Sequence, residues 1–213
     1  RRGLKLPELK RNLREIVESF NRVTTKYKDK TKVGIVGEIY VKYSSLGNND
    51  LEELLLSEGC EVMVPGLLGF IMYCFENSVI DYQLYGGTYI KSIVMRRINE
   101  YLGKMEGLMI DAVKSCSNFV APSPFSHMKN LVDGIIGLGC KMGEGWFLPA
   151  EMVELINCGY SNIVVAQPFG CLPNHIVGKG VIANIKALHP EANIVPIDYD
   201  PGATRVNQEN RIK

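Results

Sequence analysis

The chain has 213 residues, of which 46% are hydrophobic and 22% are charged, an ordinary composition for a globular protein with a packed core. Its 24 basic and 23 acidic residues leave a formal net charge of +1. A nucleic-acid-binding protein would need an excess of basic side chains on one face. No apolar run approaches the roughly 18 residues that span a membrane, and no secretory signal opens the chain. We therefore expect a cytoplasmic protein with neither nucleic acid nor membrane among its partners.

Two features of the chain bear on its context. It begins Arg1-Arg2-Gly3 without an initiator Met and ends where a helical pattern has only begun, which predicts a segment of a longer protein. Its cysteines form no C-x-x-C pair, so we expect reduced thiols, each of which is by default a small buried hydrophobe rather than a ligand. The six are Cys60, Cys74, Cys116, Cys140, Cys158 and Cys171.

The first third of the chain predicts a helix followed by a β-α-β unit. Apolar residues recur at three- and four-residue steps over residues 7–28, which indicates an amphipathic helix. Residues 33–37 form a short β-branched run typical of a buried parallel strand. Asp50 and Glu53 have the spacing of a helix cap, and residues 61–64 predict a second strand.

The middle of the chain is helical in pattern. Residues 67–116 are rich in Tyr, Phe and Met and have little strand character, and residues 126–138 predict another helix. Aromatic side chains in such a segment belong to a core or to a subunit interface, so a homo-oligomer is one expectation. We expect three parts: an N-terminal helix over residues 1–30, an α/β domain over 31–66 and 140–213, and a helical insertion over 67–139.

The alternation of helices and strands resumes after this insertion. Residues 149–158 and 174–188 predict helices, while residues 162–166 and 193–197 predict strands. Pro196 cannot donate a ladder hydrogen bond, which predicts that the last strand lies at an edge. Four strands with intervening helices indicate an α/β fold with an open, mostly parallel, Rossmann-like sheet.

Ligands of such sheets bind beyond the carboxyl ends of the strands. The loop after the third strand reads QPFGCLPNH and places Cys171 between Pro168 and Pro173, just before a helix. Free backbone amides at that helix would favour the thiolate, the form that ligates iron or acts as a nucleophile. The alternative is a buried thiol in a rigid turn, and the pattern alone leaves both open.

Other residues at this edge have two interpretations each. His175 has the spacing to bond a sulfur, to protonate a substrate or to cap the helix. Glu38, after the first strand, and Asp198, after the fourth, either bind a ligand or cap a loop. Gly178 and Gly180 weaken the helix that they lie in, which indicates a close backbone approach. Gly34 and Gly37 do not form the G-x-G-x-x-G fingerprint of a nicotinamide site.

Four stretches of the chain resemble acyl-CoA dehydratase activase-related proteins, a family that includes the 2-hydroxyacyl-CoA dehydratases. They cover residues 33–41, 143–148, 167–180 and 197–213, with the sequences VGIVGEIYV, GEGWFL, QPFGCLPNHIVGKG and IDYDPGATRVNQENRIK. In that family such segments form the C-terminal part of long chains that also contain an ATP-dependent activase module. The third stretch is the most specific.

The resemblance implies a Rossmann-like domain beside a cysteine-bound iron–sulfur cluster of the 4Fe–4S type. Such proteins are lyase components of anaerobes that dehydrate a 2-hydroxyacyl-CoA with a low-potential electron from an ATP-hydrolysing activase. Cys171 is the one residue that the resemblance implies as a metal ligand. From their places at the strand ends, we also predict His175 and Glu38 as catalytic residues and Gly170 and Asn174 as cofactor-binding residues. A cubane takes three or four ligands, and this chain has one in a matched motif and no P-loop. The alternative is a cluster-free scaffold that binds a CoA thioester or docks a partner protein.

Overall fold

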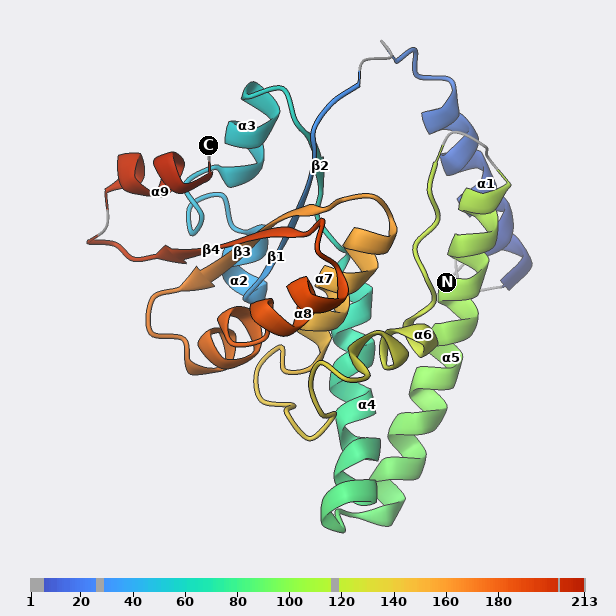
Figure 1. The fold of residues 1–213 in the computed structure, drawn as a ribbon. Helices are drawn as coiled ribbons and strands as arrows, with labels where there is room; N and C mark the ends of the chain where they lie inside the picture. The colour runs from blue at the N-terminus through green and yellow to red at the C-terminus, as the bar shows by residue number, and fades with distance from the viewer. Residues whose placement is uncertain (1–5, 26–28, 116–118, 203, 213) are drawn as a thin grey trace.

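The computed structural model describes residues 6–25, 29–115, 119–202 and 204–212, and its centre is a parallel sheet (Figure 1). The strands lie in the order β2-β1-β3-β4, and each neighbouring pair is parallel. The fold is therefore α/β with an open parallel sheet, as the sequence predicts, and β4 lies at an edge, as Pro196 indicates. The strands are β1 (Lys32–Gly37), β2 (Glu61–Met63), β3 (Asn162–Pro168) and β4 (Asn193–Tyr199).

Gly37 ends β1 beside β3 in a backbone conformation that leaves no room for a side chain. Its φ is 140°, and a Cβ added there would lie 1.8 Å from the carbonyl oxygen of Ala166 on β3. The next amide, that of Glu38, donates to the same oxygen at 3.0 Å. Any side chain at Gly37 would therefore separate β1 from β3.

Helices cover both faces of the sheet (Figure 1). On one face the apolar side chains of β1, β3 and β4 pack against α7, α8 and the π-helical segment η2. On the other face they pack against α2, α3 and α9. The covering helices are α2 (Ile39–Tyr43), α3 (Leu51–Ser57), α7 (Phe147–Asn157), η2 (Asn174–Lys179), α8 (Ile182–Leu188) and α9 (Arg205–Ile212).

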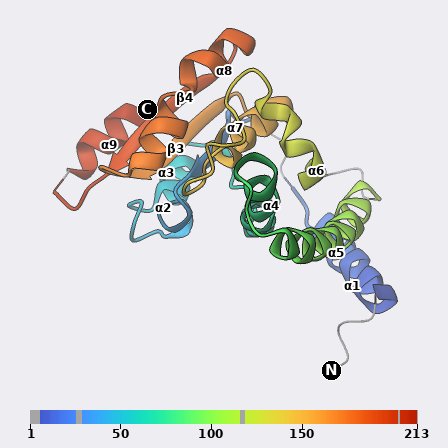
Figure 2. The ribbon, with the colours of Figure 1, turned by 90° about the horizontal axis from the view of Figure 1, so that it is seen from below.

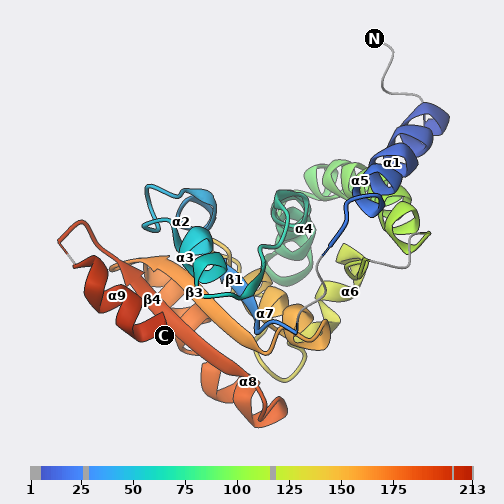
Figure 3. The same ribbon diagram turned by 90° about the horizontal axis from the view of Figure 1, so that it is seen from above.

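The remaining helices extend to one side of the sheet. Two long helices, α4 (Leu67–Tyr85) and α5 (Tyr89–Lys114), form a hairpin that turns at Gly86, whose φ is 68°. Helix α1 (Leu6–Asn21) packs along α5 on the side away from the sheet (Figures 2 and 3). A third apolar cluster around the fully buried Trp146 joins α4 to α7. Within the described residues, none of the helices has the length and apolar character that membrane crossing takes.

Three details of the predicted elements are wrong. The helix expected over residues 126–138 is only α6 (Phe125–Met128) and a 3-10 turn, η1 (Asn130–Val132), because Gly134 takes a φ of 77°. The helix expected over 174–188 is divided between η2 and α8.

The third detail is the helix cap. The side chain of Asp50 makes no cap hydrogen bond, and its φ is 56°. Instead, Oδ1 of Asn48 accepts from the amide of Leu51 at 3.1 Å, so α3 is capped from a residue earlier in the loop. Parts of the predicted helices over residues 7–28 and 67–116, Cys116 included, lie outside the described residues.

Candidate functional site

The site lies where the strand order reverses. The chain passes from β1 to β2 on one side of the sheet and later returns to add β3 on the other side of β1. Crevices that bind ligands form at the carboxyl ends of strands at such a switch point. Glu38 directly follows β1, the loop with Cys171 directly follows β3, and Asp198 lies near the end of β4.

Cys171 is held at the start of the helical turn that leads into η2. Its amide donates to the carbonyl of Pro168 at 3.2 Å, which closes a tight turn in which Gly170 has a φ of 75°. Its side chain is half-buried. The sulfur accepts a hydrogen bond from Nδ2 of Asn174 at 3.2 Å. Cys171 is therefore fixed from both backbone and side chain while remaining within reach of solvent.

The two apolar neighbours of Cys171 are turned outward. Phe169 is 70% exposed and Leu172 is 69% exposed. Ile176, one turn further, is also exposed. Exposed apolar side chains clustered around a functional group are typical of a surface that another molecule covers.

Glu144 joins the two sides of the crevice. It is buried, and its Oε1 accepts from the amide of Ile39 at 3.0 Å, while its Oε2 accepts from Nδ2 of Asn174 at 2.9 Å. The carboxylate thus links the end of β1 to the Cys171 loop. It follows Gly143, and Gly145 has a φ of 46° with no room for a Cβ beside Cys140 and Tyr73. Sequence reasoning used this stretch only for its resemblance and missed Glu144; an acidic residue between two glycines was the available signal.

Two carboxamide oxygens near the site have no donor. Within the described part of the chain, Oδ1 of Asn174 and Oε1 of Gln167 are buried without a hydrogen-bond partner. In both residues the side-chain nitrogen donates to an acceptor, and this bond orients the carboxamide. For Gln167 the acceptor is Oδ1 of Asp198 at 2.7 Å. Leaving such an acceptor unpaired costs about 1–3 kcal/mol. The orientation of these amides is therefore set by what their nitrogens bind.

Asp198 is the centre of a second polar cluster beside the loop. Its carboxylate accepts from Gln167 and, at 2.7 Å, from Nζ of Lys179. Burial acts to raise the pKa of Asp198, but the hydrogen bonds from Gln167 and Lys179 outweigh it and leave the pKa below its usual value. Gly178 packs closely beside this cluster, because a Cβ there would lie 3.3 Å from Oε1 of Gln167.

His175 connects the two clusters. Its Nδ1 lies 2.8 Å from the carbonyl oxygen of Cys171, and because a carbonyl only accepts, Nδ1 carries the proton. Its Nε2 lies 3.5 Å from Nζ of Lys179 and 3.5 Å from Oδ1 of Asp198. The ring therefore braces the backbone of the loop. It does not make the bond to the Cys171 sulfur that the spacing of His175 also allowed.

The structure places the other predicted residues around the same edge. Glu38 caps α2, with its Oε2 accepting from the amide of Val41 at 2.8 Å. Gly170 forms the turn before Cys171, and nothing lies within 4 Å of the position its Cβ would take. Asn174 contacts the sulfur directly. The sequence thus brought Cys171, Asn174, His175 and Asp198 into one site, with Glu38 at its border.

Among the described residues, no three His, Cys, Asp or Glu side chains lie together so that they could hold a metal ion. The site offers one cysteine sulfur, that of Cys171, which accepts an N–H from Asn174. Comparisons of the chain with protein-family models, curated proteins and solved structures found no match.

A buried ion pair lies behind the crevice. Nζ of Lys42 on α2 lies 3.0 and 3.1 Å from the two carboxylate oxygens of Glu151 on α7, and the side chains are 2% and 4% exposed. Burial raises the pKa of Glu151, and Lys42 opposes that effect. The pair fixes α2, and with it Glu38, against α7. Neither residue stood out in the sequence.

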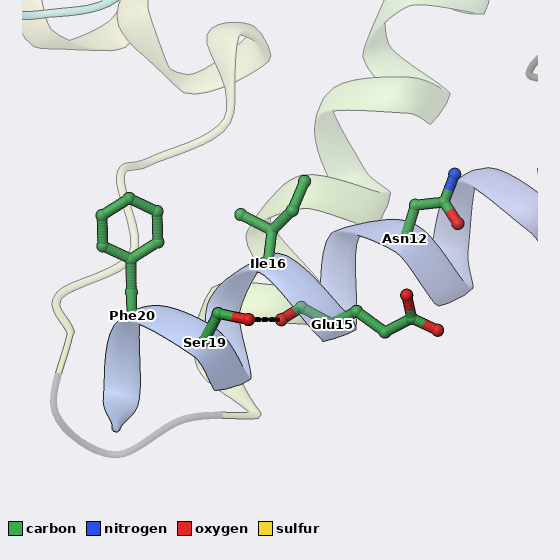
Figure 4. A pocket seen from close by; sticks show the side chains of 5 residues that line it. All are labelled: Asn12, Glu15, Ile16, Ser19 and Phe20. Atoms are coloured by element: carbon green, nitrogen blue, oxygen red, sulfur yellow. Dashed lines mark hydrogen bonds between the residues drawn. The ribbon is translucent and has the colours of Figure 1, made fainter. Parts of the chain in front are cut away.

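Two hollows lie apart from the Cys171 loop, and the first of them reaches the carboxyl end of β2 at Met63. An apolar cavity of about 350 Å³ between the α4–α5 hairpin and α7 is bordered by Glu106, Glu151 and Glu154. These carboxylates already accept from Phe125, Lys42 and Ser123. The second is a surface hollow on α1 (Figure 4), lined by Asn12, Glu15, Ile16, Ser19 and Phe20. In it the hydroxyl of Ser19 donates to the backbone carbonyl of Glu15 at 2.7 Å, and Nε of Arg11 lies 3.7 Å from the Glu15 carboxylate.

Proposed function

We propose that this chain is the α/β part of a larger iron–sulfur protein related to the 2-hydroxyacyl-CoA dehydratases, and that Cys171 is one of the cluster ligands. The observation that carries the proposal is the half-buried Cys171 sulfur at the switch point, which accepts an N–H from Asn174. Thiolates that ligate clusters commonly accept such hydrogen bonds, which adjust the potential of the cluster.

The remaining ligands would come from another segment or another subunit, since one thiolate cannot hold a cubane. The exposed Phe169 and Leu172 on either side of Cys171 support this arrangement, because a second polypeptide that covers them would bring its own ligands to the sulfur. The bonds that Asp198 accepts from Gln167 and Lys179 support it as well, since they hold the segments on either side of the loop in one geometry before anything binds.

When bound, the cluster would supply one-electron chemistry at low potential for removing water from a 2-hydroxyacyl-CoA. The chain's own residues would hold the cluster at one position and orient the ligand that binds it. Cys171 would provide the ligand and Asn174 the donor to its sulfur, while His175 would brace the Cys171 backbone and Lys179 would hold the following turn on Asp198. The partners in this proposal are an ATP-dependent activase module and an acyl-CoA, and the compartment is the cytoplasm.

The test is anaerobic purification of the natural polypeptide that contains this sequence, followed by iron and sulfide analysis. We expect a coloured protein that loses its iron when Cys171 is replaced by Ser. Cys60→Ser is the matched control, because Cys60 is also half-buried but packs against the apolar cluster on the α2–α3 face. A colourless, iron-free wild type would refute the proposal.

The alternative function is a cluster-free scaffold that binds a CoA thioester or docks a partner. The exposed rim of Phe169, Leu172 and Ile176 favours it, since such a rim serves a docking surface without any metal. In that case Cys171→Ser would leave the iron and sulfide content and the colour of the protein unchanged, whereas Leu172→Asp would weaken the binding of the partner. The two functions are therefore separated by the same set of variants.

A further inference from the structure

We propose that the apolar cavity between the α4–α5 hairpin and α7 binds a small organic cation, with an apolar body inside the cavity and an amine held by Glu106 and Glu154. The described walls of the cavity contain no residue of the Cys171 loop. Such binding would therefore be a second property of this chain, separate from the role proposed for Cys171.

The cavity has the size and the walls of a small-molecule site. Its volume is about 350 Å³, and its walls come from the end of β2, both helices of the hairpin, residues 120–128 and α7. Most of the lining is apolar, and Met109, Ile110, Phe125 and Phe147 belong to it. Pockets of about 300–1,000 Å³ with mostly apolar walls and a few polar groups are typical of sites that bury a small ligand.

The charge of the walls sets the kind of ligand. Three carboxylates line the cavity, those of Glu106, Glu151 and Glu154, and no Lys, Arg or His is among its described lining residues. Lys42 neutralises Glu151 in a buried pair. Within the described part of the chain, Glu106 and Glu154 form no salt bridge. Two of the three carboxylates are therefore without a cation.

Neutral donors hold these two carboxylates in place. Both oxygens of Glu106 accept from the single amide of Phe125, at 3.0 and 3.1 Å, and Oε1 of Glu154 accepts from the amide of Ser123 at 2.8 Å. Ser123 and Phe125 are two residues apart, so the two carboxylates belong to the same part of the wall. An ionised carboxylate has about four acceptor sites, and each therefore has sites left for further donors.

An ammonium group is the ligand feature that this part of the wall fits. A carboxylate in an apolar wall is unfavourable unless a positive charge meets it. Burial raises the pKa of Glu106 above its usual value, and the amide of Phe125 opposes this only in part. An ammonium donates up to three charge-assisted hydrogen bonds, enough for both carboxylates. Nζ of Lys32 lies over the Tyr160 ring, 5.4 Å from its centre, and pairs with neither of them.

The experiment measures the binding of a matched ligand series to the natural polypeptide by isothermal titration calorimetry at about pH 7, where alkylamines are protonated. The series is phenylbutylamine, phenylbutanol and phenylbutanoate, with octylamine and octanol as the linear pair. We expect each amine to bind about tenfold or more tightly than its alcohol, because a charge-assisted hydrogen bond contributes about that factor. Phenylbutanoate should not bind, since two carboxylates would repel it.

Two variants locate the charge that selects the amine. In Glu106→Gln and Glu154→Gln the side chain keeps its size and an oxygen that accepts from the Phe125 or Ser123 amide. Each should weaken the binding of the amines about tenfold and leave that of phenylbutanol unchanged. Glu100→Gln is the matched control, because Glu100 lies on α5 as Glu106 does but outside the cavity lining, where it pairs with Arg97. It should leave both affinities at the wild-type value.

Methionine methyl resonances place the bound amine. Those of Met109 and Met128, in the cavity lining, should shift when phenylbutylamine binds, whereas that of Met142, which is 74% exposed and outside the lining, should not. If a Gln variant does not fold, the ligand series and these shifts on the wild type decide. Equal affinity for amine and alcohol, binding of phenylbutanoate alone, or no binding of either amine would overturn the proposal. So would an amine affinity that both Gln variants leave unchanged. None of these results depends on iron at Cys171.

Discussion

Removing one partner of the Lys42–Glu151 pair should destabilise the protein more than any surface ion pair could. Lys42→Met keeps the length of the side chain but leaves Glu151, 4% exposed, without its cation. Breaking a buried pair in this way costs about 3–5 kcal/mol. Arg97→Met is the control, because its partner Glu100 lies 2.9 Å away but the two side chains are 76% and 49% exposed. Pairs of that kind contribute about 0–1 kcal/mol.

The free energy of unfolding that Lys42→Met loses should depend on pH in a defined direction. Burial holds the pKa of Glu151 above its ordinary 4.5, and removing Lys42 should raise it further. A carboxyl whose pKa is higher in the folded state favours folding when protonated, so its unfavourable effect grows as pH rises from 4.5 toward the folded-state pKa. Lys42→Met should therefore be less destabilising at pH 5 than at pH 8.

Urea unfolding followed by the fluorescence of Trp146, the single and fully buried tryptophan, measures these differences. The double variant Lys42→Met/Glu151→Leu should recover most of the lost stability, since apolar replacements of buried pairs are often neutral. The reasoning is refuted if the single variant is equally unstable at both pH values and the double variant is no better.

Two further predictions concern the frame of the site. Gly37→Ala should destabilise the protein by more than about 3 kcal/mol, because the new Cβ would collide with Ala166, whereas Gly59→Ala, at a φ of 85° in open space, should cost about 1 kcal/mol. Thermal unfolding of both variants checks this pair. Asp198→Asn should remove stability that the wild type has at pH 6; because the pKa of Asp198 lies below 3.8 in the folded state, the difference between the two proteins should shrink as pH falls below about 4. Equal differences at pH 6 and pH 3 would contradict it.

The parallel sheet could be predicted because its strands carry a local signature. Residues 33–37 and 162–166 are short apolar β-branched runs between polar segments, and such runs are typical of strands buried on both faces. Pro196 placed β4 at the edge for an equally local reason. The prediction of a helix over 126–138 was wrong because it rested on the apolar spacing alone. Gly134, Gly137 and Gly139 disfavour a helix in this segment, and Gly134 takes a positive φ.

The polar partners could not be predicted in the same way. Glu144 and Ile39 are 105 residues apart, and Lys42 and Glu151 are 109 apart. Periodicity shows which face of a helix is buried, but not which polar side chain of another element meets it. Lys42 in particular lies in a short helix with no pattern that predicts burial. Cys171 could be singled out because the nine residues around it, QPFGCLPNH, form an unusual sequence. The role of Glu144 is visible only from its contacts with Ile39 and Asn174.

The contacts around Cys171 have one property that bears on its role. The loop and the helical turn after it are fixed from three strands: the backbone bonds to the end of β3, Asn174 and Glu144 link it to the end of β1, and Lys179 donates to Asp198 on β4. Yet its outer side is open and apolar, with Phe169 and Leu172 exposed. A thiol that only fills a core would need neither the amide on its sulfur nor the open side. The ligand role proposed for Cys171 would use both, since the geometry of a ligand that a second polypeptide completes is best set before the partner arrives.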